Sequence, residues 1–162
     1  MGKDTNKTAM APPGGADAAK VKKRSFELKE KAQDLASDVF IFTSVSQKEY
    51  RTSICKKVQD ITCEAIHCLR LANSFKIGSS ARKSAQQDSI EMFSRLLDLF
   101  PVLAKCKCIS MEQERVLEKK TLSLKLSVEK WLEKDQERIE EVKAKKSSII
   151  SVQRQPSSIT LL

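Results

Sequence analysis

Apolar residues recur at alternating spacings of four and three along four consecutive segments of this chain, a pattern that severely limits its fold. Such spacing places side chains on one face of a helix. The first stripe contains Leu28, Ala32, Leu35, Val39 and Phe42. The second contains Ile54, Val58, Ile61, Ala65, Cys68 and Ala72, and the third, less regular, contains Ala81, Ala85, Ile90, Phe93, Leu97, Phe100 and Ala104. The fourth contains Leu117, Thr121, Leu124, Val128 and Trp131 and continues through Ile139 and Val142. The pattern predicts four amphipathic helices.

Serine residues mark the starts of the later helices. Ser46 with Glu49, and Ser110 with Gln113, have the spacing of a capping box, in which two side chains bond each other's backbone N–H groups. The sequence Gly78-Ser79-Ser80 interrupts the apolar pattern and offers an N-cap for the third helix. Each signal predicts a short connection.

Short connections favour antiparallel neighbours, so we expect an all-α, up-down four-helix bundle over residues 25–144. The second helix is expected over 47–75, and Pro101 is expected to kink the third helix near its last turn. Residues 1–24 are expected to form a disordered basic leader, and 145–162 a flexible tail, because neither segment can bury enough apolar surface.

The composition supports this fold class and excludes a membrane protein. Four glycines, four prolines and 5% aromatic residues leave few strand and turn signals. The longest stretches without a charge, Val39–Gln47 among them, have nine residues, well short of the roughly 20 that span a bilayer. Five cysteines without a secretory signal indicate reduced thiols. We therefore expect a cytoplasmic protein.

The charge balance points to a polyanionic partner. The chain has 30 basic and 21 acidic residues, and the basic excess lies in both tails and in the middle helices. Basic side chains that face outward neutralise phosphates, although a solvated basic face also serves solubility. The few aromatic residues lie mostly on apolar stripes, so sequence-specific readout of single strands is not expected. Basic residues beside the helix faces and turns are Lys56, Arg70, Lys76, Arg82, Lys83, Lys105 and Lys107.

A second set of apolar residues lies beside the core stripes. On the third helix, this second set is turned about 100° from the core stripe of that helix. One small bundle is not expected to bury every residue of both sets. We therefore expect a ring-like homo-oligomer, whose subunit number the stripes leave open. The expected interface residues are Ile66, Leu69, Met92, Leu96, Leu99, Leu103, Leu122 and Leu126.

Catalytic and metal-binding patterns are weak. Glu64 and His67 have the Glu-x-x-His spacing of di-iron bundles, but the chain has one histidine and both residues fall away from the core face. Cys63, His67, Cys106 and Cys108 fit no common zinc spacing. No turn motif brackets a nucleophile. We expect no cofactor, no metal and no enzymatic activity; a metal enzyme that uses Glu64 and His67 is the alternative.

Several short runs resemble one superfamily of four-helix bundles. It contains the accessory variability proteins of diversity-generating retroelements and the intervening-sequence proteins encoded within bacterial large ribosomal RNA genes. The resemblance covers about residues 26–138 and rests on helix phasing and similar runs. These runs are Leu28–Phe40, Ser46–Ile54, Ala65–Asn73, Met92–Leu103, Ile109–Gln113 and Leu126–Leu132. The chain departs from the intervening-sequence pattern at Ile61–Ile66, and Asn73-Ser-Phe replaces a Glu-Gly, which favours the accessory-protein branch.

This resemblance implies a basic homopentameric barrel that binds a reverse transcriptase and its template RNA. Such a subunit supports mutagenic complementary-DNA synthesis without being catalytic itself. By matching position, the residues expected to contact polymerase or RNA are Arg51, Lys56, Lys57, Arg70, Lys76, Arg82 and Lys83. The alternative is an interaction scaffold of the intervening-sequence type that binds only proteins and whose positive charge aids solubility.

Overall fold

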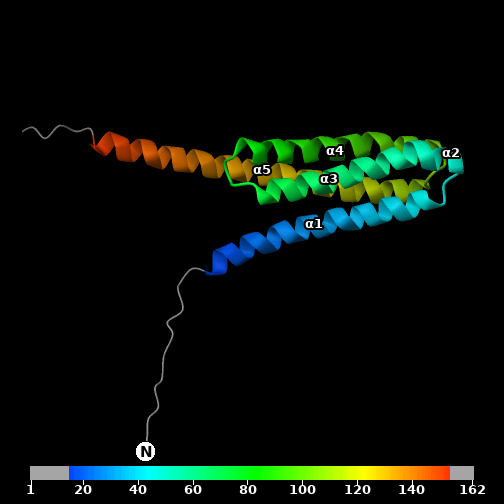
Figure 1. The fold of residues 1–162 in the computed structure, drawn as a ribbon, viewed down its shortest axis with the longest axis horizontal. Helices are drawn as coiled ribbons and strands as arrows, with labels where there is room; N and C mark the ends of the chain where they lie inside the picture. The colour runs from blue at the N-terminus through cyan, green and yellow to red at the C-terminus, as the bar shows by residue number, and fades with distance from the viewer. Residues whose placement is uncertain (1–14, 154–162) are drawn as a thin grey trace, which may run out of the picture.

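The computed structural model describes the backbone of residues 15–153 and the side chains of residues 27–148. Four long helical stretches make up this part of the chain (Figure 1). The helices are α1 (Gly15–Ser44), α2 (Lys48–Tyr50), the π-helical turn η1 (Arg51–Cys55), α3 (Lys56–Ser74), α4 (Ser80–Lys105) and α5 (Met111–Gln153). Since α2, η1 and α3 follow one another without a break, they form one irregular helix, as predicted for residues 47–75.

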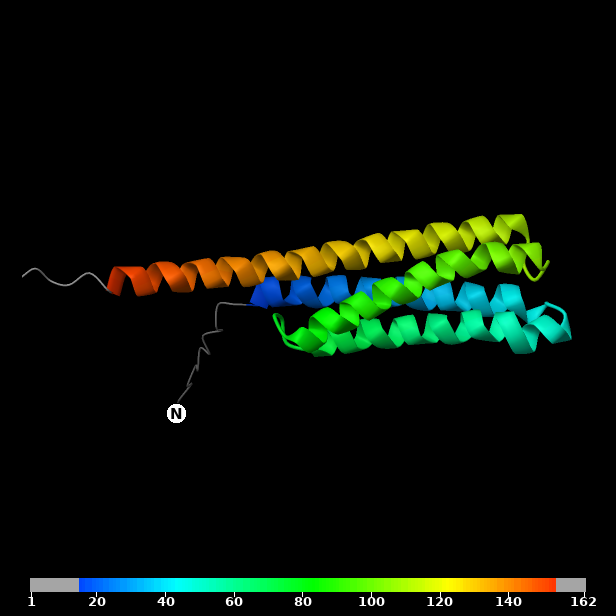
Figure 2. The same cartoon turned by 90° about the horizontal axis from the view of Figure 1, so that it is seen from above.

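The four stretches form a bundle in which α1 and α4 each pack against α3 and α5. Successive long helices run in opposite directions, which agrees with the predicted up-down order (Figure 2). We call the end that holds α2 and the α4–α5 turn the α2 end, and the end that holds the α3–α4 turn the Gly78 end. The fold is therefore the all-α four-helix arrangement that the apolar stripes predict.

Both predicted domain boundaries need correction. Helix α1 begins at Gly15, inside the segment expected to be a leader, and α5 continues to Gln153, past the expected start of the tail at residue 145. The last turns of α5 extend beyond the bundle (Figure 1). The side chains over 140–148 are exposed. Residues 1–14 and 154–162 lie outside the described part of the chain.

The stripes on α1, α3 and α5 supply the core, largely as predicted. Leu35, Val39, Val58 and Leu117 are fully buried in one apolar cluster. On α4, however, the buried face follows a different register: Ala81 is exposed, and Ile90, Leu97 and Ala104 are only half-buried. The buried α4 side chains are Arg82, Ala85, Gln86, Ser89, Phe93, Leu96, Phe100 and Leu103. Without Ala85, these residues follow a regular four-three spacing. Arg82, Gln86 and Ser89 at the start of this stripe are polar, so a search for apolar residues does not detect it.

Two of the three predicted helix starts are confirmed. The Ser110 hydroxyl accepts from Gln113 N at 3.1 Å and the Gln113 side chain accepts from Ser110 N at 2.9 Å, a complete capping box. The Ser79 hydroxyl accepts from Arg82 N at 3.2 Å at the start of α4.

Pro101 lies inside α4, which continues through it to Lys105.

The predicted capping box at Ser46 is wrong. Gln47 occupies the N-cap position of α2 without a side-chain bond, and the Ser46 hydroxyl instead donates to the Cys108 carbonyl at 2.9 Å. This bond ties the α1–α2 connection to the α4–α5 turn. In the following helix, the Ser53 hydroxyl donates to the Glu49 carbonyl at 2.8 Å, and such side-chain competition for carbonyls accompanies the π-helical turn η1.

Candidate functional site

The α2 end concentrates positive charge from two segments that are distant in the sequence. Residues 47–57 and 104–110 together carry six basic side chains and one acidic side chain. The bond between Ser46 and the Cys108 carbonyl holds these segments at the same end of the bundle. We call the six exposed cations the basic end; they are Lys48, Arg51, Lys56, Lys57, Lys105 and Lys107.

Most of the basic end is available to a partner. Lys56 Nζ pairs with Asp60 at 3.1 Å, but both side chains are more than half exposed, so the pair is weak and competes poorly with a phosphate. The side chains of Arg51 and Lys57 make no hydrogen bond or ion pair with the described residues. Of the seven predicted contact residues, these three lie together at the basic end.

The turn between α4 and α5 positions Lys105 and Lys107. Lys107 has a φ of 57°, in the left-handed region that favours glycine. Its N–H donates to the Ala104 carbonyl and the Cys108 N–H donates to the Leu103 carbonyl, both at 2.9 Å, which is the Schellman pattern of a helix C-terminus. The turn is therefore well defined although a lysine occupies the position that glycine normally takes.

Apolar side chains lie next to these cations. Val45 is 84% exposed and Met111 is 63% exposed, and together with Lys107 they line a shallow depression of about 450 Å³. Ile41, one helical turn before Val45, is also exposed. The α2 end thus combines positive charge with an apolar surface.

The remaining predicted contact residues lie toward the Gly78 end. Arg70 and Lys56 are separated by fourteen residues of α3, or about 21 Å at 1.5 Å per residue. Arg70 contacts the ring nitrogen Nδ1 of His67 at 3.2 Å, while Lys76 is exposed in the α3–α4 turn and Lys83 is exposed in the first turn of α4. The predicted residues therefore form two separate groups.

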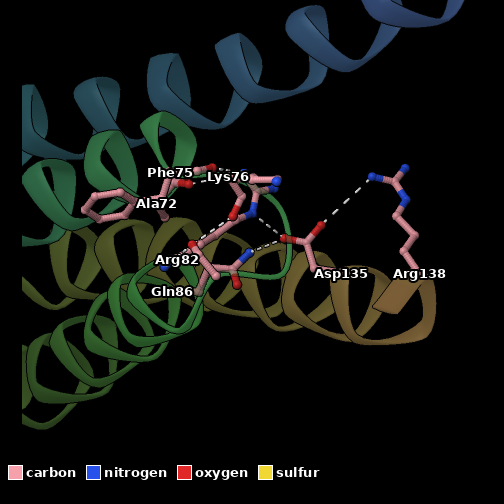
Figure 3. A network of polar contacts seen from close by, with 8 residues as sticks. Ala72, Phe75, Lys76, Arg82, Gln86, Asp135 and Arg138 are labelled. Carbon is pink, nitrogen blue, oxygen red and sulfur yellow. Dashed lines mark hydrogen bonds and ion pairs between the residues drawn. The ribbon is translucent and has the colours of Figure 1, made fainter. Parts of the chain in front are cut away.

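Arg82 does not belong to either group, so the prediction that it contacts a partner is wrong. Its side chain is buried, and its Nε donates to Asp135 Oδ2 at 2.6 Å (Figure 3). Its Nη1 donates to the carbonyls of Ala72 and Phe75 at 3.2 and 3.3 Å, which satisfies acceptors at the end of α3. The guanidinium also lies over the Trp131 ring, 4.8 Å from its centroid. Arg82 thus joins α3, α4 and α5.

Asp135 is the second member of this buried network. Gln86 Nε2 donates to its Oδ2 at 3.0 Å, and Arg138 Nη1 lies 4.0 Å from its Oδ1 (Figure 3). The helical spacing places both charged residues on buried stripes. Asp135 continues the α5 stripe four residues after Trp131, and Arg82 lies four residues before Gln86 on the α4 stripe. Our sequence prediction missed the pair because it treated charged residues as exposed.

The predicted interface residues divide into three classes. Leu69, Leu96 and Leu103 are buried in the core of their own chain, so the prediction that they contact another subunit is wrong. Ile66, Met92 and Leu99 are half-buried against that core. Leu122 and Leu126 are 49% and 47% exposed on the outer face of α5. A single bundle therefore buries more of the second apolar set than expected, and only these last two leucines are left largely exposed.

Within the described side chains, no three His, Cys, Asp or Glu residues are placed to hold a metal ion. Glu64 and His67 are both exposed on α3, and the His67 ring contacts Arg70. Over the same part of the chain, no helix has the length and apolarity needed to cross a membrane.

Comparison of the chain with protein-family models, with curated proteins and with solved structures gave no match.

Proposed function

We propose that this chain is a non-catalytic accessory subunit that binds a retroelement reverse transcriptase and its template RNA in the cytoplasm. The basic end carries the proposal, because six exposed cations come together there from two separate segments. Lysine and arginine side chains that neutralise phosphates release bound counterions, which favours binding of a polyanion without reading its sequence. Arg51, Lys56 and Lys57 are the contact residues that we assign to this surface.

The apolar depression beside the basic end supports a protein partner next to the RNA. Val45 and Met111 expose apolar surface to solvent within the same depression that Lys107 lines. Mixed cationic and apolar surface suits a ribonucleoprotein, in which one subunit contacts RNA and polymerase together. The proposal therefore assigns the polymerase to the depression and the RNA to the surrounding cations.

A salt titration with matched variants tests the RNA part of the proposal. Replacing Arg51, Lys56 and Lys57 by glutamine should weaken binding of a structured RNA and reduce the slope of log affinity against log salt by about 2 to 3. The control replaces Arg70, Lys76 and Lys83 by glutamine, which removes the same charge from the Gly78 end. The control should bind nearly as the unaltered protein does; equal losses from the two variants would contradict a site at the basic end.

The polymerase part needs a separate readout. The unaltered chain should co-purify with a retroelement reverse transcriptase and increase its complementary-DNA yield on the template RNA. A Val45→Glu/Met111→Glu variant should lose co-purification but keep most RNA affinity. Retention of the polymerase by this variant would place that contact elsewhere.

A scaffold that binds only proteins is the second candidate. The exposed side chains of Ile41, Val45 and Met111 favour it, because contiguous apolar surface marks protein contacts. This candidate predicts that RNA affinity is weak and that the glutamine substitutions at the basic end leave it unchanged.

A further inference from the structure

The α3–α4 turn exposes large apolar side chains at the Gly78 end. Phe75 and Ile77, two residues apart in this turn, are 37% and 43% exposed. Val142 is 53% exposed and lies about one helical turn after Ile139, whose side chain lies next to Gly78. Polar residues and glycine dominate most turns. Three exposed apolar side chains at one end of the bundle therefore point to contact with a partner.

Lysines accompany these apolar side chains. Residues 65–87 and 142–148 contain no aspartate or glutamate, although Glu140 and Glu141 come just before the second segment. Five lysines of the two segments are exposed, and their side chains make no hydrogen bond or ion pair with the described residues; they are Lys76, Lys83, Lys143, Lys145 and Lys146. We call these lysines, together with Phe75, Ile77 and Val142, the Gly78 surface. Because five lysines outnumber the two carboxylates, its net charge is positive.

The shape of the Gly78 surface favours a flat partner over a peptide. Helix α5 runs past the α3–α4 turn and continues alone (Figure 2). The hollow that Gly78 and Ile139 line has a volume of about 20 Å³, which is room for roughly one water molecule. The anchor residue of a protein partner needs a larger pocket to fill. Apolar side chains that project beside lysines suit a lipid surface, because they enter between lipid chains while the ammonium groups stay at the headgroups.

We propose that the Gly78 surface binds a membrane that contains anionic phospholipids. Phe75 and Ile77 contribute apolar area, and the lysines contribute attraction to the negative headgroups. Each lysine near such a membrane raises the affinity about fivefold. Anionic lipids are typical of the cytoplasmic leaflet, which agrees with the proposed location of the chain. The basic end lies at the opposite end of the bundle, so binding of RNA there is a separate property.

The α2 end also combines cations with apolar side chains, but it suits a membrane less well. Val45 and Met111 line a depression there, so part of their apolar surface faces a hollow and not a plane. Glu49 lies among the cations, and Asp60 pairs with Lys56 at 3.1 Å. The Gly78 surface has neither feature. We therefore assign the membrane to the Gly78 end.

Vesicle sedimentation of the full chain tests the binding. The protein should bind vesicles of phosphatidylcholine and phosphatidylserine in equal parts, and it should bind pure phosphatidylcholine much more weakly. Added salt should lower the affinity, because ions screen the attraction. Replacing Lys76, Lys83 and Lys143 by glutamine should weaken binding to the mixed vesicles about 100-fold. These lysines are exposed and make no side-chain bond with the described residues, so the variant should keep its helical circular dichroism.

The matched control removes three charges from the basic end by replacing Arg51, Lys56 and Lys57 with glutamine. It should bind the mixed vesicles within a few-fold of the unaltered protein. Equal losses from the two variants would mean that any basic surface suffices and would overturn the proposal. So would a failure of the unaltered chain to bind the mixed vesicles. If the variant at the Gly78 end loses RNA affinity and keeps its vesicle binding, these lysines contact RNA and the proposal is wrong.

Tryptophan fluorescence tests which end enters the membrane. On addition of the mixed vesicles, the emission of Ile77→Trp should shift to shorter wavelength, and brominated lipid should quench it. Val45→Trp places the probe at the α2 end and should show neither change. Trp131 is present in both variants and contributes the same background. A shift in Val45→Trp alone would place the membrane at the α2 end and overturn the proposal.

Discussion

The hydroxyl group of Thr121 lies in the core of the bundle without a hydrogen-bond partner among the described residues. A buried hydroxyl that loses its bonds to water and gains none destabilises the folded state. Valine has nearly the same shape, so Thr121→Val should raise the free energy of unfolding by about 1 kcal/mol in urea denaturation.

A second threonine supplies the control for this prediction. Thr62 is equally buried on α3, but its hydroxyl donates to the Val58 carbonyl at 2.7 Å. Thr62→Val removes a satisfied bond and should give no gain. If the two substitutions change the free energy of unfolding equally, the missing partner of Thr121 has no energetic consequence.

At the scale of elements, the Arg82–Asp135 pair connects α4 to α5 and also satisfies carbonyls at the end of α3. Removing one member of a buried pair leaves an uncompensated charge. We expect Arg82→Ala and Asp135→Ala each to lower the free energy of unfolding by about 3–5 kcal/mol. Arg82→Leu combined with Asp135→Leu should cost less than the two single changes added together, because the double variant leaves neither charge unpaired.

The exposed pair of Lys56 and Asp60 tests whether burial is the cause. Its atoms lie 3.1 Å apart, similar to the buried pair, but water screens both side chains. Lys56→Ala or Asp60→Ala should change the free energy of unfolding by less than about 1 kcal/mol. Comparable losses at the two pairs would mean that the Arg82–Asp135 contact contributes through something other than its burial.

The helices could be predicted from the sequence, but the buried face of α4 could not. Three apolar stripes and the Ser110–Gln113 capping box depend on local spacing, so the helices and their order could be predicted. The α4 register could not be predicted from apolar residues alone, because Arg82, Gln86 and Ser89 occupy buried positions. Arg82 is buried only because α5 brings Asp135 opposite it, and this information lies 53 residues away in the chain.

At the scale of the whole molecule, the candidate binding surface depends on where the basic residues lie and not only on how many there are. The predicted contact residues Arg51, Lys56 and Lys57 gain Lys105 and Lys107 as neighbours only once the α4–α5 turn is placed beside Ser46. Arg70, Lys76 and Lys83 remain at the other end of α3. A surface that joins distant segments requires the fold, so the site could be predicted only in part.

Self-association is the remaining property of the whole molecule, and it now depends on a smaller surface than the sequence suggested. Leu69, Leu96 and Leu103 are buried within the chain, so Leu122 and Leu126 on α5 are the exposed members of the predicted interface. These leucines are one helical turn apart and face outward together. We propose that copies of the chain associate through these leucines, and the family resemblance implies a pentamer. Light scattering should then give a mass several times the 18.2 kDa of one chain.

Two pairs of charge substitutions distinguish this surface from the apolar residues at the α2 end. Leu122→Glu/Leu126→Glu should reduce the solution mass to that of one chain, because burying two carboxylates at an interface is costly. The α1 variant, Ile41→Glu/Val45→Glu, alters a more exposed apolar pair, one residue in the last turn of α1 and one directly after it, and should leave the mass unchanged. If only the α1 variant dissociates, the chains associate through the α2 end, and the depression there is occupied by another copy rather than by a polymerase. A single-chain mass for the unaltered protein would exclude self-association altogether and leave the outward leucines of α5 to a different partner.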